Sequence, residues 1–431
     1  MDRVEATVAA VMHQVTQDAL LDAVVGLVET PSPTGAERPL ADWIAGRLHG
    51  GRVRAHTQVI DDLQANAVAV LPGGGNGPST LLYAPIDTFT TGLERYDVPG
   101  AATAMRADME PRAVVEGDLV QGLGAGNPKG HAACVLVALA ALEAAGVEPR
   151  GDVVAAFGAG GMPAFAVDGL GTQGRANTGH GVGAGFLLER GLTTDAAIIA
   201  KPGWSVSHEE VGLVWLDVSV PGLHTYVGSR QRLPYRNAVA AAGLVALRLE
   251  EWLDDYAERH EHGTMRPQGV VSSVTGGLPH LAASTPAEVR LRLDLRLTTE
   301  QTPAGVTREV RAFVDGLARE LDLPLTVTQV AAIPATRTDP TAPVVRAAVA
   351  AWEAVAGVPH DPIRQNSGAT DANVLRMRGV PTARLGMPKV TRGIGGAEVD
   401  FTLGMNLVDL REMRRLVEIL VRAVLSLQGP E

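Results

Sequence analysis

Two basic side chains, Lys129 and His131, stand at the end of a glycine-rich turn, which is a place where a protein can hold a polar or anionic group. The stretch 120–136, VQGLGAGNPKGHAACVL, passes from a strand-like segment through four glycines into an apolar helix. Glycine allows a close approach of backbone or ligand, and the first N–H groups of a helix lack partners within it. A mostly parallel sheet has its ligand crevice at the carboxyl ends of the strands, where we expect this turn.

The turn fits neither of the common nucleotide-binding motifs. A phosphate-binding loop needs Ser or Thr directly after its lysine, but Gly130 follows Lys129. The dinucleotide motif G-x-G-x-x-G needs one residue more than the spacing of Gly122, Gly124 and Gly126 provides. The motif therefore does not support nucleotide binding.

The composition limits the class of protein. The chain has 431 residues, 46% of them hydrophobic, which is enough for two domains with real cores. Its net charge of −11 disfavours nucleic acid and anionic membranes as partners. The single cysteine, Cys134, lies in an all-apolar helix and is interpreted as a packing residue. We find neither a signal core nor an apolar run of membrane length, and we expect a cytoplasmic protein.

Strands and helices that alternate along the chain must position these residues. Strands are predicted at 66–71, 80–84, 151–158 and 196–204, and helices at 5–28, 38–48, 342–357 and 407–427. Asp87 and Lys201 come at the ends of two of these strands, so both side chains are expected at the crevice. This pattern predicts an α/β domain with a mostly parallel sheet flanked by helices.

The segment between these parts has a pattern of its own. The expected order is a strand at 211–220, a helix at 235–259, strands at 269–275 and 288–298, a helix at 307–320 and a strand at 323–330. The order β-α-β-β-α-β is that of a ferredoxin-like unit. We therefore predict a discontinuous α/β domain, 1–206 and 333–431, with a ferredoxin-like domain inserted at 207–332.

The chain resembles the two-zinc deacylases and exopeptidases, a family that includes aminoacylase, acetylornithine deacetylase, succinyl-diaminopimelate desuccinylase and glutamate carboxypeptidase. Their central motif reads G-R-G-x-x-D-M-K-G. Gly122, Gly124, Lys129 and Gly130 match it, with Asn127 in place of the Asp that bridges the two metals. The resemblance extends over nearly the whole chain, and it implies that the inserted domain is a lid that mediates dimerisation.

The same resemblance implies that every metal-ligand position carries another residue. Pro85 replaces a His, Asn127 the bridging Asp, Lys201 an acid before a proline and Val399 the last His. The adjacent glutamates expected after the strand 151–158 are missing. Zinc needs three or more N, O or S ligands, and catalytic zinc also needs an open position. We therefore expect no metal and no other cofactor.

The residues that remain predict a cationic pocket. We expect Lys201, Asp87, Lys129, His131 and Asn127 to be the catalytic residues, because preorganised donors stabilise an anion or a developing oxyanion. A lysine among like charges, or out of water, also has a lowered pKa and can take part in proton transfer. The structural alternatives are that Asp87 caps a turn, that Lys201 only pairs with Asp87, and that His131 fills space.

Five further residues are expected to bind substrate. By resemblance, His224 is the lid His that reaches across the dimer to polarise the scissile carbonyl, and Arg296 holds a substrate carboxylate. Arg175 and His180, in the glycine-rich segment 158–185, add positive charge, unless this segment is only a solvated loop. Asp371 lies in QNSGATD, which is close to a family motif.

Three functions follow as hypotheses. We favour a metal-independent hydrolase or lyase that cleaves an amide or related C–N bond in a small carboxylate-bearing substrate. The second is a non-catalytic ligand-binding protein on the same fold. The third is a metallohydrolase with rearranged ligands drawn from Asp168, His131, His180 or His208. The expected partners are a small anionic ligand and a second copy of the chain bound through the lid, not nucleic acid or a membrane.

Overall fold

The computed structural model describes residues 3–171 and 175–428 and divides into two compact units. The first unit contains the chain up to His208, Thr338–Pro362, and the chain from Thr370 on; the second contains Glu209–Arg337 and Ile363–Ala369. The short segment at 363–369 was expected in the first domain. It belongs to the second because Asn366 forms a β-bridge with Met265, and Ser367 Oγ accepts a hydrogen bond from Gln268 N at 3.0 Å.

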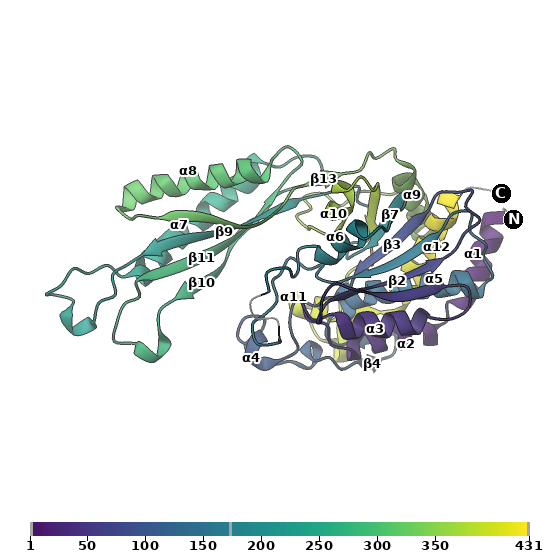
Figure 1. The fold of residues 1–431 in the computed structure, drawn as a ribbon, viewed down its shortest axis with the longest axis horizontal. Helices are drawn as coiled ribbons and strands as arrows, with labels where there is room; N and C mark the ends of the chain where they lie inside the picture. The colour runs from purple at the N-terminus through teal and green to yellow at the C-terminus, as the bar shows by residue number, and fades with distance from the viewer. Residues whose placement is uncertain (1–2, 172–174, 429–431) are drawn as a thin grey trace. The chain divides into compact units, whose positions relative to one another are not determined.

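A six-stranded sheet forms the centre of the first unit (Figure 1). Its order is β1 (Arg54–Val59), β2 (Ala65–Leu71), β6 (Val153–Gly158), β3 (Thr80–Pro85), β7 (Ala196–Ala200) and β14 (Thr382–Leu385). The last four strands are parallel to one another, and β1 and β2 pair antiparallel at one edge. β3 and β7 are buried along their whole length, as expected for parallel strands covered on both faces. The prediction of a mostly parallel sheet is confirmed.

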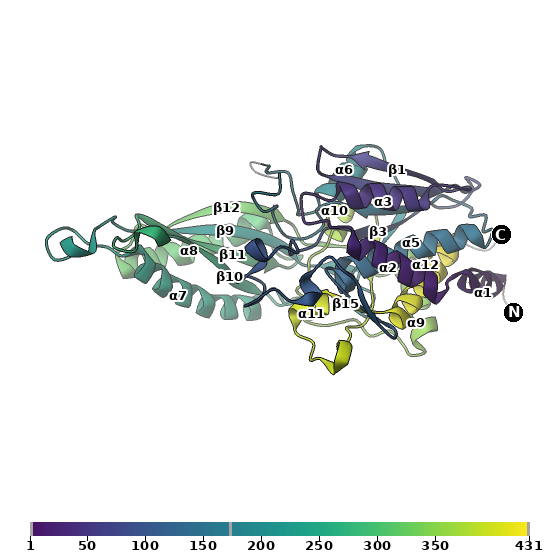
Figure 2. The same ribbon diagram turned by 90° about the horizontal axis from the view of Figure 1, so that it is seen from below.

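Helices cover both faces of this sheet. One face packs against α5 (Gly130–Ala144), α9 (Pro343–Ala356) and α12 (Leu410–Gln428), and the opposite face against α6 (Val182–Glu189) and α10 (Ala372–Met377). Figures 1 and 2 show α2 (Gln17–Glu29), α5 and α12 side by side, and these helices are in mutual contact. Successive residues of a strand point to opposite faces, so Leu82 belongs to the first core and Tyr83 to the second.

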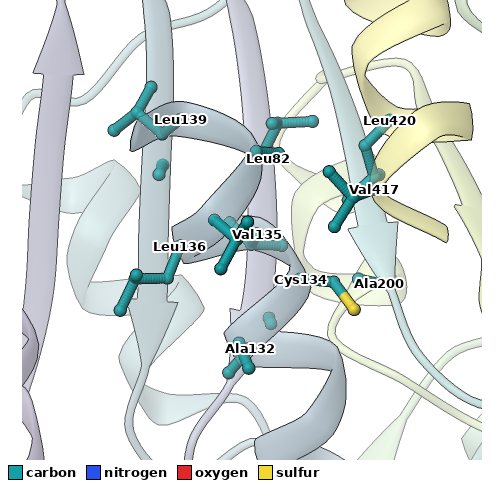
Figure 3. Close-up of a cluster of buried hydrophobic side chains, with 14 of the residues drawn as sticks. Leu82, Ala132, Cys134, Val135, Leu136, Leu139, Ala200, Val417 and Leu420 are labelled. Carbon is teal, nitrogen blue, oxygen red and sulfur yellow. The ribbon is translucent and has the colours of Figure 1, made fainter. Parts of the chain in front are cut away.

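Helix α5 lies at the middle of the larger core. Its sequence is apolar on all sides, and Figure 3 shows its side chains in one cluster with Leu82 of β3 and Val417 and Leu420 of α12. A helix that is hydrophobic all round is a buried helix. Cys134 is fully buried here, and burial raises the pKa of its thiol, which fits a packing role. The helix that follows the glycine-rich turn is therefore fixed in position by the core.

The second unit is a four-stranded antiparallel sheet covered on one face by two helices (Figure 2). The order is β10 (Gly269–Gly276), β11 (Glu288–Leu297), β9 (Gly212–Pro221) and β12 (Thr326–Ile333), with helices α7 (Ala238–Arg259) and α8 (Pro303–Leu321). On β11, Leu291, Leu293 and Leu295 are buried against the helices, while the alternate residues are partly exposed. The predicted ferredoxin-like order of elements is confirmed.

The remaining elements are shorter or peripheral. They are α1 (Arg3–Gln14), α2 (Gln17–Glu29), α3 (Arg38–Leu48), α4 (Glu94–Asp97), β4 (Val114–Glu116), β5 (Leu119–Gln121), β8 (Glu209–Glu210), β13 (Thr336–Arg337), α11 (Phe401–Met405) and β15 (Leu407–Asp409). The single helix expected at 5–28 is wrong: it is two helices, because Thr16 adopts an extended conformation and its Oγ1 caps α2 by accepting from Ala19 N at 3.1 Å. Among the described residues, no helix is long and apolar enough to cross a membrane.

Candidate active site

The glycine-rich turn presents Asn127 at the start of α5. Gly124 has a left-handed conformation with φ of 78°, the five residues Ala125–Lys129 form a wide turn, and Asn127 within it is extended. A Cβ on Gly126 would lie 2.5 Å from the carbonyl oxygen of Gly404, so only glycine allows the turn to pack this closely on the 404–408 backbone. The Asn127 amide Nδ2 approaches Met405 Sδ at 3.6 Å, whereas Oδ1 is buried and has no hydrogen-bond partner among the described residues.

Asp87 is a completely buried carboxyl that is enclosed by hydrogen bonds. It lies two residues beyond β3, and its Oδ2 accepts from Thr34 Oγ1 at 2.7 Å. Its Oδ1 accepts from Gly161 N at 2.7 Å and Met162 N at 3.2 Å. Burial raises the pKa of Asp87, while the Thr34 hydroxyl and the positive charge of Lys201 act in the opposite direction. These contacts go well beyond a local turn cap.

A second buried carboxyl, Glu37, lies beside Asp87 and was not among the predicted site residues. Its Oε1 accepts from Gly35 N at 2.8 Å and Gly160 N at 2.9 Å. Burial, followed by the negative charge of Asp87, raises the pKa of Glu37 to about 8. In the sequence Glu37 comes just before the helix at 38–48, where an acidic residue is also what an ordinary first helical turn contains, so the residue was not chosen.

The loop that follows β6 thus serves to hold carboxyl groups. It provides three successive N–H groups, from Gly160, Gly161 and Met162, to Glu37 and Asp87. There is no room for larger residues, since a Cβ on Gly161 would lie 2.3 Å from Cβ of Pro85 and 2.5 Å from Oδ2 of Asp371. This part of the glycine-rich segment is therefore a buried element of the site and not a solvated loop.

Lys201 lies directly beyond β7 and is the cation of this buried cluster. Only 4% of the residue is exposed, and its Nζ lies 3.6 Å from Met162 Sδ. Its charge lowers the pKa of two neighbours, Asp87 and His131. The structure therefore places Lys201 and Asp87 at the carboxyl ends of β7 and β3, as their positions after buried strands predicted. His131, from the first turn of α5, is close enough for the charge of Lys201 to act on it.

His131 is a neutral imidazole. Burial, and then the positive charge of Lys201, lower its pKa to about 3. The backbone N–H of Met387 points at Nε2 from 3.4 Å, so Nε2 acts as the acceptor and the ring proton resides on Nδ1. At neutral pH this ring is not a cation, and its Nε2 lone pair is engaged.

Lys129 does not lie where it was expected to act. Its Nζ donates to the carbonyl oxygens of Thr30 at 2.9 Å and Val28 at 3.4 Å, at the end of α2. The last carbonyls of a helix lack partners within the helix and attract a cation. Complete burial lowers the pKa of Lys129 to about 7. The structure assigns this lysine to holding α2 against α5, rather than to a group with Asp87.

Two cavities meet at Asn127, and both lie within the first unit. The smaller, of about 350 Å³, is lined by Phe89, Ala101, Leu123 and Asn127 among others. The larger, of about 550 Å³, is lined by residues that include Asn127, His131, Pro202, Lys389 and Val399. Phe401 and Met405 also border both. Asn127 of the turn and His131 of the strand-end cluster therefore line a space that is large enough for a small molecule, whereas Asp87 and Lys201 are not among its lining residues.

The residues at this place do not match the donor set of a two-zinc centre. Pro85 and Val399 have no donor atom, Asn127 offers one neutral oxygen, and Lys201 is a cation. Over residues 3–171 and 175–428, no group of three or more His, Cys, Asp or Glu side chains is placed to hold a metal ion. That includes Asp168, His131, His180 and His208, the ligands considered for a rearranged site.

Three residues expected to bind substrate make contacts within the first unit. Arg175 forms an ion pair with Asp61 and donates to Gly35 O at 2.7 Å. The ring of His180 packs edge-on against Phe165, with centroids 4.8 Å apart. Asp371 accepts a hydrogen bond from Tyr83 Oη at 2.6 Å and is buried. These contacts explain how each residue is held, and substrate binding by them stays a prediction.

The other two, His224 and Arg296, belong to the second unit. His224 is exposed, and its Nδ1 donates to Thr285 O at 2.8 Å, so the ring is oriented by this bond. Arg296 forms a bidentate pair with Asp294 at 2.8 and 2.9 Å on the face of β11 that points away from the helices. Part of the Arg296 guanidinium is therefore already engaged by a carboxylate of its own strand.

Comparisons with known proteins agree with this architecture. Residues 98–426 match the model of peptidase family M20/M25/M40. Succinyl-diaminopimelate desuccinylase of Leptothrix cholodnii is 26% identical over 318 residues, covering 70% of this chain and 74% of that protein. Human carnosine dipeptidase 1 has a similar fold, with a TM-score of 0.71 at 14% identity over 99% of each chain. A hydantoinase/carbamoylase family amidase from Burkholderia ambifaria has a TM-score of 0.60 at 18% identity, over 96% of this chain and 98% of its own.

Proposed function

Because this chain belongs to peptidase family M20/M25/M40, its function is peptidase-like or amidohydrolase-like, and we propose that it exerts that function without a metal. In this proposal it is a hydrolase or lyase that acts on an amide or related C–N bond of a small carboxylate-bearing substrate. The observation that carries the proposal is the buried Lys201, whose charge lowers the pKa of both Asp87 and His131. His131 lines the larger cavity, and no metal-ligand group is found among the described residues.

Lys201 supplies the positive charge of the proposed reaction. An ammonium group held in a site with little water stabilises negative charge that develops on a carbonyl oxygen, without reorganisation during the step. Asp87 keeps this cation in place, since its own oxygens are fixed by Thr34 and by the loop at Gly161. Asn127 orients the substrate at the junction of the two cavities.

Lys389 is the group that we assign to the substrate carboxylate. It is exposed, lines the larger cavity and has no ion-pair partner among the described residues. The acidic residues that line the same cavity are neutralised, because Asp400 pairs with Arg106, Asp409 with Arg411 and Glu412 with Arg415. A carboxylate in this cavity would therefore meet one uncompensated cation.

The proposal also includes a homodimer built through the second unit. β10 is an edge strand and carries Val270 and Val274 with 46% and 64% of their surface exposed. On α7, Leu244 and Leu247 are 43% and 66% exposed. Exposed apolar side chains on a sheet edge and a neighbouring helix favour pairing with another chain. In such a dimer His224, once protonated, would offer Nε2–H to a substrate carbonyl of the partner.

A second candidate, a binding protein without catalysis, is favoured by one observation. Asp87 has both oxygens occupied, and His131 is neutral with its Nε2 engaged, so neither is poised to accept a proton from water. Turnover separates the two candidates. Purified protein, in excess chelator, is incubated with a library of N-acyl amino acids and dipeptides, and products are detected by mass spectrometry.

Cleavage in chelator, with well under one metal ion per chain by elemental analysis, supports the enzyme. Binding of library members without cleavage supports the binding protein. A tightly held stoichiometric ion, with activity lost on its removal, would overturn both candidates, the metal-independent enzyme and the binding protein without catalysis.

A further inference from the structure

The smaller cavity has an uncharged, largely apolar lining, which disfavours a charged ligand group. None of the described residues that line it carries a charge. Its walls include Phe89, Leu123, Phe401 and Met405, and the two phenylalanines are 45% and 77% exposed. Large apolar side chains exposed around a hollow are characteristic of ligand-binding surfaces.

The fully buried polar side-chain atoms of this cavity have, with one exception, hydrogen-bond partners among the described residues. Thr88 Oγ1 donates to Thr90 O at 2.7 Å, and Thr402 Oγ1 donates to Ala101 O at 3.2 Å. Asn406 accepts from Gly124 N at 2.8 Å and donates to Asp108 at 3.2 Å. Asn127 Oδ1 is the exception, since it is buried and without a hydrogen-bond partner among the described residues. A buried acceptor with no donor is unfavourable, so a ligand N–H at this place would be recognised.

From these two observations we propose that the smaller cavity binds an uncharged, apolar acyl or side-chain group of the substrate, and that Asn127 Oδ1 accepts the N–H of the adjoining amide. The amide as ligand rests on the proposed function; the preference for an apolar group rests on the cavity alone. A dicarboxylic acyl group would place its second carboxylate against an uncharged wall, at a large desolvation cost. The carboxylate of the substrate lies in the other cavity, at Lys389.

Two matched probes test the apolar preference. N-(4-methylpentanoyl)glycine and N-succinylglycine have nearly the same shape, and differ by an isopropyl group in place of a carboxylate. Titration calorimetry on the full chain should give a dissociation constant at least about tenfold lower for the 4-methylpentanoyl probe. Equal affinity, tighter binding of the succinyl probe, or no binding of either at millimolar concentration would overturn the assignment.

A third probe tests the hydrogen bond to Asn127. N-(4-methylpentanoyl)sarcosine lacks the amide N–H and should bind about tenfold more weakly than the glycine probe. Asn127→Leu keeps the approximate shape of the side chain but removes the Oδ1 acceptor. This variant should therefore bind the glycine and sarcosine probes with similar affinity. If the glycine and sarcosine probes already bind wild type equally, Asn127 Oδ1 does not accept this N–H.

A cavity-filling substitution locates the binding. Ala101→Leu should weaken the 4-methylpentanoyl probe at least about tenfold, with Ala101→Val intermediate. Ala104→Leu is the matched control, because Ala104 is exposed and does not line the cavity. Thermal unfolding verifies that each variant is folded. A folded Ala101→Leu or Ala101→Val protein that binds the probe like wild type places the acyl group elsewhere.

The outcome for this cavity can be told apart from the outcome for catalysis. Selective binding of the apolar probe without cleavage in chelator would leave the cavity assignment standing and remove the proposed enzyme. Cleavage of N-acyl amino acids without preference for the apolar probe would support the proposed enzyme and remove the cavity assignment.

Discussion

Glu37 and Asp87 are held by neighbouring N–H groups of one loop: Gly160 N donates to Glu37 Oε1 at 2.9 Å, and Gly161 N donates to Asp87 Oδ1 at 2.7 Å. The two carboxyl groups are therefore parts of one buried cluster, in which the negative charge of Asp87 disfavours ionisation of Glu37. The pKa of Glu37, raised to about 8, follows from this arrangement and from burial.

Glu37 should make the protein less stable as the pH rises. Its ordinary pKa of 4.5 becomes about 8 in the folded chain, so the folded state retains a proton that the unfolded state releases. Protonated Glu37 contributes fully to the free energy of unfolding below pH 4.5, and this contribution is lost as the pH rises to 8. The free energy of unfolding falls by up to about 1.4 kcal/mol per pH unit in this range. Glu37→Gln carries no proton to lose, so its stability relative to wild type should increase across this range in urea unfolding.

The control for this measurement is Glu29→Gln, an exposed acid near the end of α2. The difference in unfolding free energy between Glu29→Gln and wild type, measured over the same pH range, is the baseline for the comparison. A pH-independent difference for Glu37→Gln would show that Glu37 is ionised in the folded protein at neutral pH.

Lys129 should have the opposite pH dependence in a higher range. Its pKa falls from 10.5 to about 7 on folding, so the contribution present above pH 10.5 is lost as the pH falls to 7. Lys129→Met has no amine to titrate. Its free energy of unfolding, relative to that of wild type, should therefore rise as the pH falls from 10 to 7. Calorimetric melting of both proteins tests this, with Lys389→Met as the exposed-lysine control. A constant difference between Lys129→Met and wild type contradicts a neutral buried amine.

Lys201→Met should abolish most function while leaving the protein folded. If Lys201 is the main electrophile, its loss should cost roughly 3–4 kcal/mol, or on the order of a hundredfold or more in kcat/KM or affinity. Lys201→Glu should not create a zinc site, because Pro85 and Val399 still offer no donor. The measurements are turnover or probe binding, together with calorimetry. A lower Tm with unchanged function of the folded fraction would show that Lys201 only balances the charge of Asp87.

The dimer should depend on the edge strand of the second unit. Val270→Glu combined with Val274→Glu places two charges on β10 and should convert a dimer into a monomer in light scattering. Val59→Glu is a matched control, since Val59 is also an exposed valine, 47% exposed, on an edge strand of the first unit. His224→Ala should keep the dimer and weaken ligand binding. A wild-type monomer at micromolar concentration would refute the pairing.

Much of the fold could be predicted from the sequence because its signals are local. Buried strands such as AAIIA and the alternation of Leu291, Leu293 and Leu295 identify strand type and face without knowledge of the tertiary structure. The grouping of Asp87 with Lys201 was also predictable, since both follow strands of a parallel sheet. The break between α1 and α2 was missed because Thr16 lies within an otherwise helical pattern.

The orientation of buried polar side chains could not be predicted in the same way. Whether Lys129 turns to Asp87 or to the Thr30 carbonyl depends on where α2 ends in space, which no local pattern records. Glu37 likewise meets Asp87 only through a loop more than a hundred residues away in the chain, at Gly160. Such contacts are decided by tertiary packing, after the elements have formed.

The closeness of Gly161 to Pro85 and Asp371 also has an evolutionary consequence. Any side chain at position 161 collides with its neighbours, and Gly160 has a φ of 58° that favours glycine, so neither position can accept a glutamate by a single substitution. An acidic pair could arise there only after the surrounding residues had changed together. The packing of this loop therefore keeps positions 160 and 161 as glycine for as long as their neighbours are unchanged, whatever substitutions occur around Lys201.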